Sequence, residues 1–385
     1  LTTTGSTILG GTTSTGFENP DIESLPHSFL FWRSLAQWLG GMGIIVLSLA
    51  ILPLLGIGGM QLFQAESPGP TADKLTPRVQ ETAKLLWVVY VALTALEFML
   101  LWLHPSMDWF DALNHAFTSL ASGGFSTKNA SIAAFGSVYI DVIITLFMFL
   151  SGINFAMHFR LFKGDLGTFF NNRETRFYTI VTVIGIFIIT FSLWYFDGRT
   201  LLEALRYGSF QVVAIITTTG YVTDDYELWY TFGASVLLLF FFTGASAGST
   251  SGGLKMVRWM ILIRNLGREI KQIIHPRAII PIRIGDHVIE PSVQRTVLSF
   301  FILYIVLFGF GVILISLFGY DLISSIGASI SALGNVGPAW GEFGPTDNFA
   351  PLPYAAKWVL IVLMMVGRLE LFTVIILFSP SFWKQ

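Results

Sequence analysis

The stretch Ile216-Thr217-Thr218-Thr219-Gly220-Tyr221 has three counterparts elsewhere in the chain. They are Leu1-Thr2-Thr3-Thr4-Gly5-Ser6, Ala121-Ser122-Gly123-Gly124-Phe125-Ser126 and Gly334-Asn335-Val336-Gly337-Pro338. When the stretches are aligned on their shared glycine, they lie about 100 residues apart. This period is too long for a solenoid, but it suits a membrane unit of helix, half-helix, loop and helix. The sequence therefore predicts four pseudo-repeats.

The three later stretches each follow a segment that is too short to span a membrane. These segments cover residues 109–120, 201–215 and 321–333. Acidic residues at or near their starts suit the positive end of a helix dipole: Asp108, Asp111, Asp197, Glu203 and Asp321. We predict pore half-helices that enter from the outside and end within the membrane.

The glycine and threonine loops at the ends of these segments predict a lined cation pathway. Irregular backbone at membrane depth is tolerated only where protein or a water-filled cavity satisfies its polar groups. Half-helix C-termini carry partial negative charge, and loop carbonyls can replace the hydration shell of a cation. Glycine lets successive carbonyls face one axis, because it reaches left-handed conformations at little cost. Ordinary interhelical turns are the alternative to a filter made of Thr3, Thr4, Gly5, Ser122, Gly123, Gly124, Thr218, Thr219, Gly220, Asn335, Val336 and Gly337.

The composition is that of an all-α polytopic membrane protein. The chain has 385 residues, of which 53% are hydrophobic and 12% charged, and its mean hydropathy is +0.68. Soluble domains, by comparison, are about 25% charged. Windows of about 20 apolar residues, the length that crosses a bilayer, predict seven spans, one of them short, at residues 29–55, 85–103, 138–159, 177–196, 232–243, 297–318 and 358–378.

Basic residues gather in three loops, at residues 74–84, 160–176 and 255–295, and at the C-terminal end. The positive-inside rule predicts that these loops and the C-terminus are cytoplasmic. The alternate connections carry acids, which would attract cations to the outer mouth or would simply keep the loops soluble: Glu18, Asp21, Glu23, Asp108, Asp111, Asp224, Asp225, Glu227, Glu342 and Asp347.

The chain offers little for cofactor or metal chemistry. It contains no cysteine, which excludes disulfides, thiolate catalysis and cysteine metal sites. Its six histidines show no HxxxH or HExxH spacing. We therefore expect no cofactor in this chain. The chain begins at Leu1 within a stretch rich in threonine and glycine, and we expect that a preceding part with at least one span is absent.

A run of small residues interrupts the apolar segment that begins at Phe232. Residues 244–253 are all Gly, Ala, Ser or Thr, and each glycine weakens a helix by about 1 kcal/mol. The phosphate-binding pattern GxxxxGK[ST] fails, because Leu254 follows Gly253 and no strand precedes the run. We predict a flexible intramembrane gate beneath the filter, with a small-residue helix contact as the alternative. The gate candidates are Gly244, Ala245, Ser246, Gly248, Ser249, Thr250, Gly252, Gly253 and Lys255.

Arg368 lies in the middle of the last apolar window, two residues before Glu370. A charge within the membrane is costly, so it should face a cavity or a partner. Residues two apart on a helix diverge, which argues against a pair between these two. We predict that Arg368 faces the pathway below the filter as an electrostatic barrier, and an ion pair with another helix is the alternative. Glu97, in an earlier window, could lie near an interhelical polar contact.

Several segments together resemble the TrkH/KtrB/HKT superfamily of potassium transporters, and its TrkH branch most of all. They are TTTGS at 2–6, LPHSFLFWRSLAQWLGGMGIIVL at 25–47, GIGGMQLFQAESPGP at 56–70, SGGFST at 122–127, GSTSGGLK at 248–255 and GRLELFT at 367–373. The resemblance covers essentially the whole chain. One departure is Ser251, where TrkH relatives commonly have glycine.

The resemblance implies four M1-P-M2 units, similar to those of K⁺ channels, around one central pore. Residues 1–70 would end the first unit, and residues 71–170, 171–264 and 265–385 would form the others, with the gate at 244–253. It also implies K⁺ as the permeant ion, with glycine at Gly5 marking K⁺ preference. Further implications are a multi-pass protein of the cell inner membrane, in contact with lipid, and a homodimer. A cytoplasmic NAD- or ATP-binding regulatory ring of the TrkA type would bind it, and nucleic acid would not.

Two other classes remain for comparison. A polytopic membrane enzyme would need a catalytic pair at membrane depth, and the predicted spans show none. Within transport, a Na⁺-permeable or cation-coupled relative and a proton-coupled symporter are alternatives. The spans show no chain of acids and histidines for a proton relay, so channel-like conduction is favoured.

Overall fold

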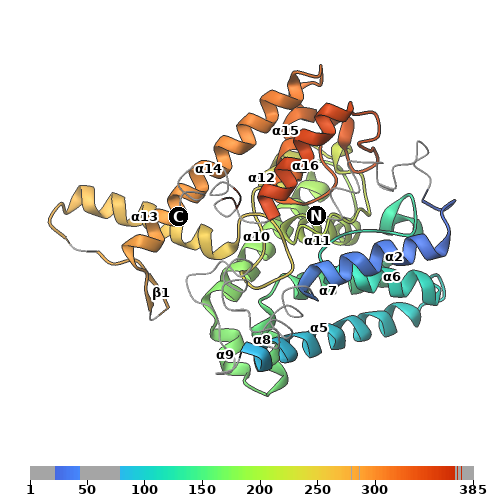
Figure 1. Ribbon diagram of the computed structural model, residues 1–385, viewed down its shortest axis with the longest axis horizontal. Coiled ribbons are helices and arrows are strands. Elements are labelled where there is room, and N and C mark those ends of the chain that lie inside the picture. Colours follow the sequence, from blue (N-terminus) through green and yellow to red (C-terminus); the bar gives the residue numbers. More distant parts are fainter. Residues whose placement is uncertain are drawn as a thin grey trace, which may run out of the picture.

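The computed structural model describes residues 22–43, 79–278, 280–285 and 287–368, together with positions 371 and 374. Nearly all regular structure in these residues is helical (Figure 1). The α-helices are α2 His27–Trp38, α5 Val79–Trp102, α6 Trp109–Leu120, α7 Val138–Ser151, α8 Phe155–Phe162, α9 Leu166–Asn171, α10 Arg173–Tyr195, α11 Leu201–Ile216, α12 Thr231–Phe240, α13 Met256–Ile274, α14 Pro291–Ser316, α15 Leu322–Gly334 and α16 Tyr354–Arg368.

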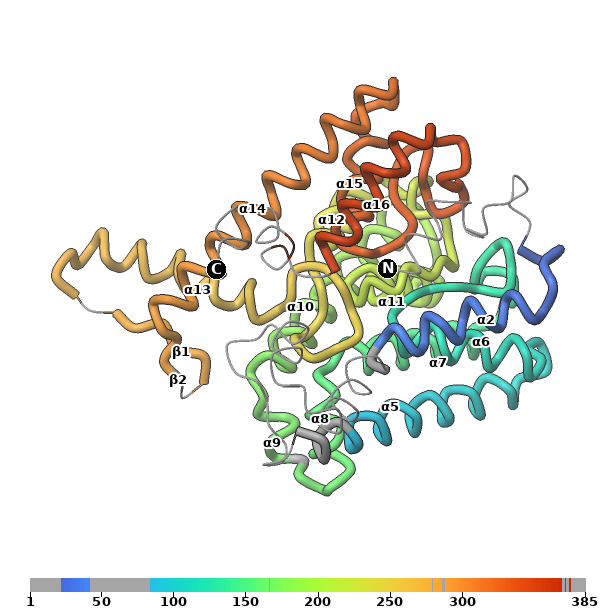
Figure 2. The backbone as a smooth tube through the Cα atoms, in the orientation of Figure 1, coloured from blue at the N-terminus to red at the C-terminus, as the bar shows by residue number. Residues whose placement is uncertain are grey.

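Shorter elements complete the described chain. Strands β1 Arg283–Ile284 and β2 His287–Val288 pair antiparallel. A π-helical turn, η2 Leu39–Gly43, continues α2, and 3₁₀ turns occur at η4 Ser131–Phe135, η5 Tyr226–Leu228 and η6 Gly341–Phe343. Figure 2 shows α13 and the β1–β2 hairpin projecting to one side of the helical body.

Three helices in the described ranges are long and apolar enough to cross a membrane: Lys84–Trp102, Arg173–Tyr195 and Pro291–Ser316. They overlap the predicted windows at 85–103, 177–196 and 297–318, and each begins one to six residues earlier. The window at 138–159, by contrast, is not one straight span, because α7 and α8 meet at 103°. Gly152 ends α7, and the Asn154 side chain caps α8 by accepting a hydrogen bond from the Ala156 amide at 2.8 Å. The hydrophobicity of the window predicted an apolar segment, but it did not predict the bend between α7 and α8.

The three predicted half-helices are present as α6, α11 and α15, with nearly the predicted bounds. Side chains cap their N-termini, which satisfies amides that have no partner within the helix. Asp108 accepts from the Asp111 amide at 2.7 Å, and Asp321 accepts from two amides of α15. Thr200 and Glu203 form a reciprocal capping box on α11. The starts of these helices could be predicted because capping depends on residues that are neighbours in the sequence.

Each of these three helices packs between the helices that precede and follow it in the chain. Helix α6 contacts α5 and α7, α11 contacts α10 and α12, and α15 contacts α14 and α16. Contacts of α2 with α6 and of α7 with α11 join successive parts (Figure 2). A partly buried ion pair joins the second pair of helices, because Arg206 Nε of α11 lies 2.7 Å from Asp141 Oδ2 of α7. The C-terminal ends of α6, α11 and α15 lead directly into the glycine-containing loops.

Candidate functional site

The loops that follow α6, α11 and α15 share one backbone conformation. In each, two residues with positive φ flank a residue with negative φ, and the flanking pairs are Ser122 and Gly124, Thr218 and Gly220, and Asn335 and Gly337. The middle amide donates to a carbonyl five residues earlier. These bonds are Gly123 to Thr118 at 2.8 Å, Thr219 to Ala214 at 2.9 Å, and Val336 to Ser331 at 3.0 Å. We call residues 122–124, 218–220 and 335–337 loops 2, 3 and 4.

The shared conformation is strained. Ser122, Thr218 and Asn335 carry a side chain yet have φ between 52° and 58°, a region that costs such residues about 1 to 3 kcal/mol each. Strain of this kind persists only where the surroundings impose it, and it is concentrated at functional sites. Alternating φ signs let successive carbonyl groups face the same side of the chain. Such a row can take the place of the water around a cation.

Backbone contacts place the three loops next to one another in order. A Cβ added to Gly124 of loop 2 would collide with the Thr219 carbonyl oxygen of loop 3. A Cβ added to Gly220 of loop 3 would collide with the Val336 carbonyl oxygen of loop 4. At Gly337 the same atom would meet nothing within 4 Å. The predicted first filter loop, with Thr3, Thr4 and Gly5, lies outside the described residues.

A cavity of about 60 Å³ opens where the three loops meet. This is enough space for more than one water molecule. Besides the loops, its lining includes the residues that follow them, such as Phe125, Val222 and Pro338, and the polar side chains of Lys128, Asn129 and Asp347. The cavity therefore lies at the mouth of the loops, on the side of their third residues.

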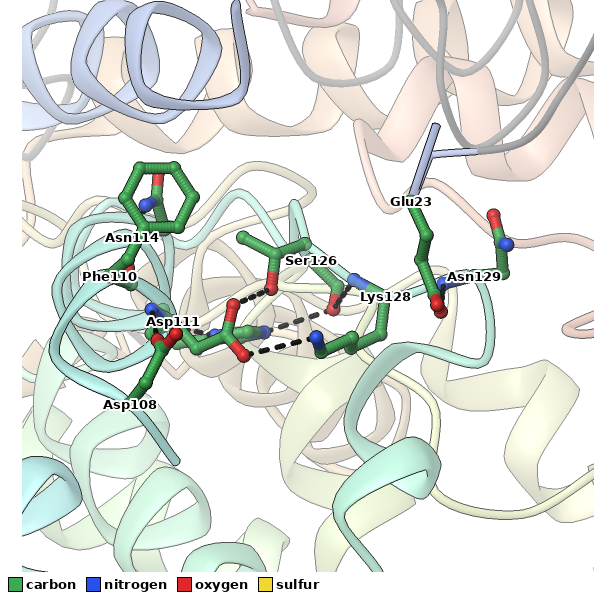
Figure 3. Close-up of polar contacts among 10 residues, drawn as sticks. Glu23, Asp108, Phe110, Asp111, Asn114, Ser126, Lys128 and Asn129 are labelled. Carbon is green, nitrogen blue, oxygen red and sulfur yellow. Dashed lines mark hydrogen bonds and ion pairs between the residues drawn. The ribbon is translucent and has the colours of Figure 1, made fainter. Parts of the chain in front are cut away.

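The acids near this mouth are not all available to attract cations. Asp111 pairs with Lys128 at 3.2 Å and accepts a hydrogen bond from Thr127 at 2.6 Å. Figure 3 shows the Asp111–Lys128 pair beside the Asp108 cap, with Glu23 next to Asn129. Asp224 is likewise paired, with Arg199 at 2.7 Å. The charge near the mouth is thus mixed, because two of the acids noted in the sequence are paired with basic side chains.

Glu227 contributes negative charge near loop 4. Its Oε1 accepts a hydrogen bond from the Gly341 amide at 2.5 Å, so η5 is tied to η6. Burial raises the pKa of the Glu227 carboxyl, and the nearby Asp225 and Asp347 raise this pKa further, against the opposing effect of the Gly341 amide. Each of these acids makes it costlier for its neighbours to be ionised. A cation at the mouth would reduce this repulsion between the carboxylates.

The segment of residues 244–253, which we call the gate segment, lies at the opposite end of the loops. Thr250 Oγ1 is 2.7 Å from Ser122 Oγ, and the Gly252 amide donates to Thr218 Oγ1 at 2.6 Å. A Cβ added to Gly252 would lie 2.5 Å from the Gly334 carbonyl oxygen, just before loop 4. The gate segment therefore contacts the first residue of loops 2 and 3 and the start of loop 4.

Hydrogen bonds hold the gate segment against the bend between α7 and α8. The Ser246 amide donates to the Gly152 carbonyl at 3.0 Å, and the Gly248 carbonyl accepts from the Phe155 amide at 3.1 Å. Most of the segment is buried, including Ala245, Ser246, Thr250, Ser251 and Gly252. In this conformation the segment is packed and hydrogen-bonded, and it can move only if these bonds break.

Two cationic side chains meet the gate segment at Ser251. Arg368 Nη1 of α16 donates to the Thr250 carbonyl at 3.1 Å and to the Ser251 carbonyl at 3.3 Å. Lys255 Nζ donates to the same Ser251 carbonyl at 2.5 Å. Arg368, which comes from a distant part of the sequence, is therefore next to the gate segment. Glu370 lies outside the described residues.

The remaining gate candidates pack within the same segment. The Gly244 amide donates to the Leu254 carbonyl at 2.8 Å, and a Cβ at Gly253 would lie 2.7 Å from the Thr243 carbonyl oxygen. Ser249 Oγ donates to the Ser246 carbonyl at 2.6 Å. These contacts close the segment into a compact turn that connects α12 to α13.

Sequence reasoning missed one acid near this site. Glu174 Oε1, in the first turn of α10, accepts from the Ala247 amide at 2.7 Å and from the Val257 amide at 3.2 Å, so it links the gate segment to the first turn of α13. Nothing in the sequence marks a first-turn acid as a partner of a segment some 70 residues later.

Glu97, which the sequence suggested could lie near an interhelical polar contact, is fully buried on α5 and faces Ser119 of α6.

Comparisons with known proteins agree with this architecture. The TrkH family profile, described as "Cation transport protein", matches residues 6–385. Two relatives named Trk system potassium uptake protein TrkH, from Salmonella typhimurium and Escherichia coli K12, are each 42% identical over 388 residues. The alignment covers 100% of this chain and 78% of each relative. Trk system potassium uptake protein TrkG of Escherichia coli K12 is 34% identical, with 100% and 77% covered.

Among solved structures, the crystal structure of the potassium transporter TrkH from Vibrio parahaemolyticus matches this chain with a TM-score of 0.83. The sequence identity is 37%, and the match covers 100% of this chain and 77% of that one. The similarity therefore extends to both fold and sequence along the whole chain.

The glycines of the loops give a direct test of the packing. Gly220→Ala should destabilise the protein by about 1 to 2 kcal/mol from the left-handed backbone, and by about a further 1 to 3 kcal/mol from overpacking against the Val336 carbonyl. Gly136→Ala is the matched control, because Gly136 also has positive φ, at 57°, but an added Cβ there meets nothing within 4 Å. Thermal unfolding of the purified variants measures the difference. Equal losses at the two positions would contradict the loop contact.

Proposed function

Because this chain belongs to the TrkH family of cation transport proteins, we propose that it takes potassium ions into the cell through a channel-like pore lined by its filter loops. The family is one of transporters rather than enzymes. The observation that carries the proposal is the shared backbone of loops 2, 3 and 4, which meet in order around one cavity. The relatives' names supply potassium as the ion.

The pathway uses backbone chemistry rather than charged side chains. A K⁺ ion that leaves water needs replacement oxygen ligands, and rows of carbonyl groups provide them. The C-terminal ends of α6, α11 and α15 lead into the loops, so their dipoles add partial negative charge there. The loop carbonyls and the helix dipoles together favour a cation in the pathway, but they do not bind it so tightly that it cannot leave. In this proposal the loop with Thr3, Thr4 and Gly5 completes a four-loop filter within four M1-P-M2 units.

The gate segment is proposed to close the pathway below the filter. It contacts Ser122 and Thr218 from beneath, so an ion leaving the filter would meet its backbone. Arg368 and Lys255 bring positive charge to the same place, where weak screening makes repulsion of a cation strong. Opening then requires the segment to leave loops 2 and 3 and to release the Gly152 and Glu174 contacts.

The surrounding assembly is part of the same proposal. The basic connection at 255–295 and the C-terminus face the cytoplasm of a multi-pass protein in the inner membrane. A cytoplasmic nucleotide-binding ring acts on that surface and on the gate segment through α13, which begins at Met256 directly after Lys255. The protein works as a homodimer. Support for a partner comes from the relatives, which are named as proteins of a Trk system.

Ion flux tests the function itself. The full-length protein in proteoliposomes should take up ⁸⁶Rb⁺, a stand-in for K⁺, faster than ²²Na⁺, because the carbonyl sites suit the larger ion. Unlabelled K⁺ should compete with ⁸⁶Rb⁺ better than Na⁺ does. Empty liposomes serve as the control. Equal uptake of the two tracers would favour a Na⁺-permeable relative, and no uptake of either would contradict the proposal.

Removing the charge of Arg368 tests the barrier. Arg368→Ala should raise ⁸⁶Rb⁺ flux several-fold, because it removes both a positive charge and two hydrogen bonds from the gate segment. The Rb⁺ to Na⁺ ratio should persist, since the filter is untouched. If Arg368 instead forms a structural ion pair, its loss should cost about 3 to 5 kcal/mol of stability without a gain in flux. Arg176→Ala removes an exposed charge from α10 and is the matched control.

Labelling tests the orientation. The chain has no cysteine, so single cysteines can be introduced without background. A cysteine at Gln272 in α13 should react with a membrane-impermeant thiol reagent only from the cytoplasmic side, and one at Asn348 only from the outside, as the positive-inside rule requires. Labelling of both positions from the same side would refute the proposed topology.

A further inference from the structure

Two tyrosines that follow loop 3 reach into the neighbouring parts of the filter. Tyr221 and Tyr226 are fully buried. The Tyr221 hydroxyl lies 2.5 Å from Thr118 Oγ1 on α6, which leads into loop 2. The Tyr226 hydroxyl donates to the Ala339 carbonyl, two residues beyond loop 4, at 2.7 Å. Loop 3 is therefore bonded through side chains to the structures on both sides of it.

Loops 2 and 4 have an internal brace that loop 3 lacks. Thr118, Ala214 and Ser331 occupy equivalent positions, since each carbonyl accepts the middle amide of its loop. Thr118 Oγ1 donates to the Phe125 carbonyl at 2.7 Å, and Ser331 Oγ donates to the Pro338 carbonyl at 2.8 Å, in both cases seven residues later. Alanine has no hydroxyl for this bond. The two tyrosines supply loop 3 with side-chain bonds that reach its neighbours instead.

The Tyr221 hydroxyl makes further contacts at this place. It lies 3.3 Å from the His115 carbonyl and 3.4 Å from the Phe125 carbonyl. A hydroxyl has one hydrogen to donate and lone pairs to accept with, so either hydroxyl can be the donor between Thr118 and Tyr221. Tyr221 thus bonds to the group that holds the outer end of loop 2. Its ring lies 5.9 Å from that of His115, whose Nε2 is 3.0 Å from Ser126 Oγ beyond loop 2.

We propose that Tyr221 and Tyr226 are positioning residues that fix the spacing of loops 2, 3 and 4 and thereby set the preference among alkali cations. This inference rests on the proposed transport function. Carbonyl oxygens held at a fixed spacing cannot close around a smaller ion, so they discriminate against Na⁺, whereas a loop that is free to shift can adapt to it. Loop 3 has side-chain bonds of its own at Thr219 and Thr218, but Ala214 gives it no bond to the residue seven positions later. The two tyrosines supply its bonds to the structures beside loops 2 and 4.

Hydroxyl deletion in the full-length protein tests the proposal. Tyr221→Phe, Tyr226→Phe and Thr118→Val should each raise ²²Na⁺ uptake relative to ⁸⁶Rb⁺ in proteoliposomes by roughly fivefold, the factor expected from one hydrogen bond. Thr118→Ser keeps the hydroxyl and should retain the native ratio. The double variant of Thr118→Val with Tyr221→Phe should change the ratio no more than Thr118→Val alone, because Thr118→Val already removes the bond to Tyr221 together with its own bond to Phe125.

Tyr178→Phe is the matched control. Tyr178 is also fully buried, and its hydroxyl donates to the Phe149 carbonyl at 3.1 Å, which belongs to α7 rather than to a filter loop. It should leave the Na⁺ to Rb⁺ ratio unchanged. A merely structural role for Tyr221 would lower thermal stability and total uptake of both tracers together, with a constant ratio.

The outcomes separate this inference from the transport function. If the unmodified protein transports Rb⁺ selectively but folded Tyr221→Phe and Thr118→Val keep its ratio, the brace is refuted and the function stands. If Tyr221→Phe does not fold, Thr118→Val alone decides. A rise in the ratio that Thr118→Ser also shows would refute the hydroxyl as the cause. Absence of Rb⁺ uptake in the unmodified protein would contradict both proposals.

Discussion

Backbone amide and carbonyl groups at membrane depth find no water to bind, so each of them needs a partner within the protein or in a wet cavity. This constraint explains why the described loops look alike. The middle amide of each loop returns to its own half-helix, at the Thr118, Ala214 and Ser331 carbonyls. Among the loop carbonyls, that of Gly337 accepts a hydrogen bond from Ser331 Oγ at 3.0 Å. In the proposed function the others face the cavity and an ion. The gate segment follows the same rule at three backbone groups, which bond to Gly152, Phe155 and Glu174.

The sequence predicted those features that depend on local chemistry. The half-helices begin at capping residues such as Asp108 and Asp321, and they end at glycine loops with a regular spacing, so their bounds were nearly correct. Arg368 was expected near the gate because a buried charge in the last apolar window needed a cavity or partner, and it donates to Thr250 and Ser251. The roles of the filter loops and of the gate remain predictions.

Other features depend on partners that are distant in sequence, and local patterns do not carry them. The hydrophobicity of residues 138–159 predicted one span. The chain instead bends near Gly152, whose carbonyl accepts a hydrogen bond from the Ser246 amide. The sequence showed acids in the loops but not their partners, and Asp111 and Asp224 are paired with Lys128 and Arg199. Tyr221 was part of a recognised motif, yet its bond to Thr118 spans 103 residues. Only the folded arrangement shows which polar groups meet.

The difference between Ala214 and its equivalents Thr118 and Ser331 has an evolutionary consequence. In a channel built from identical subunits, a single codon change alters every wall of the pathway at once. In this chain loops 2, 3 and 4 come from different stretches of one sequence, so a change in one loop leaves the others intact. If the loops line one pathway as proposed, selection can tune that pathway in smaller steps, and its walls need not remain alike. Ala214 beside Thr118 and Ser331 is the kind of divergence that a single chain permits.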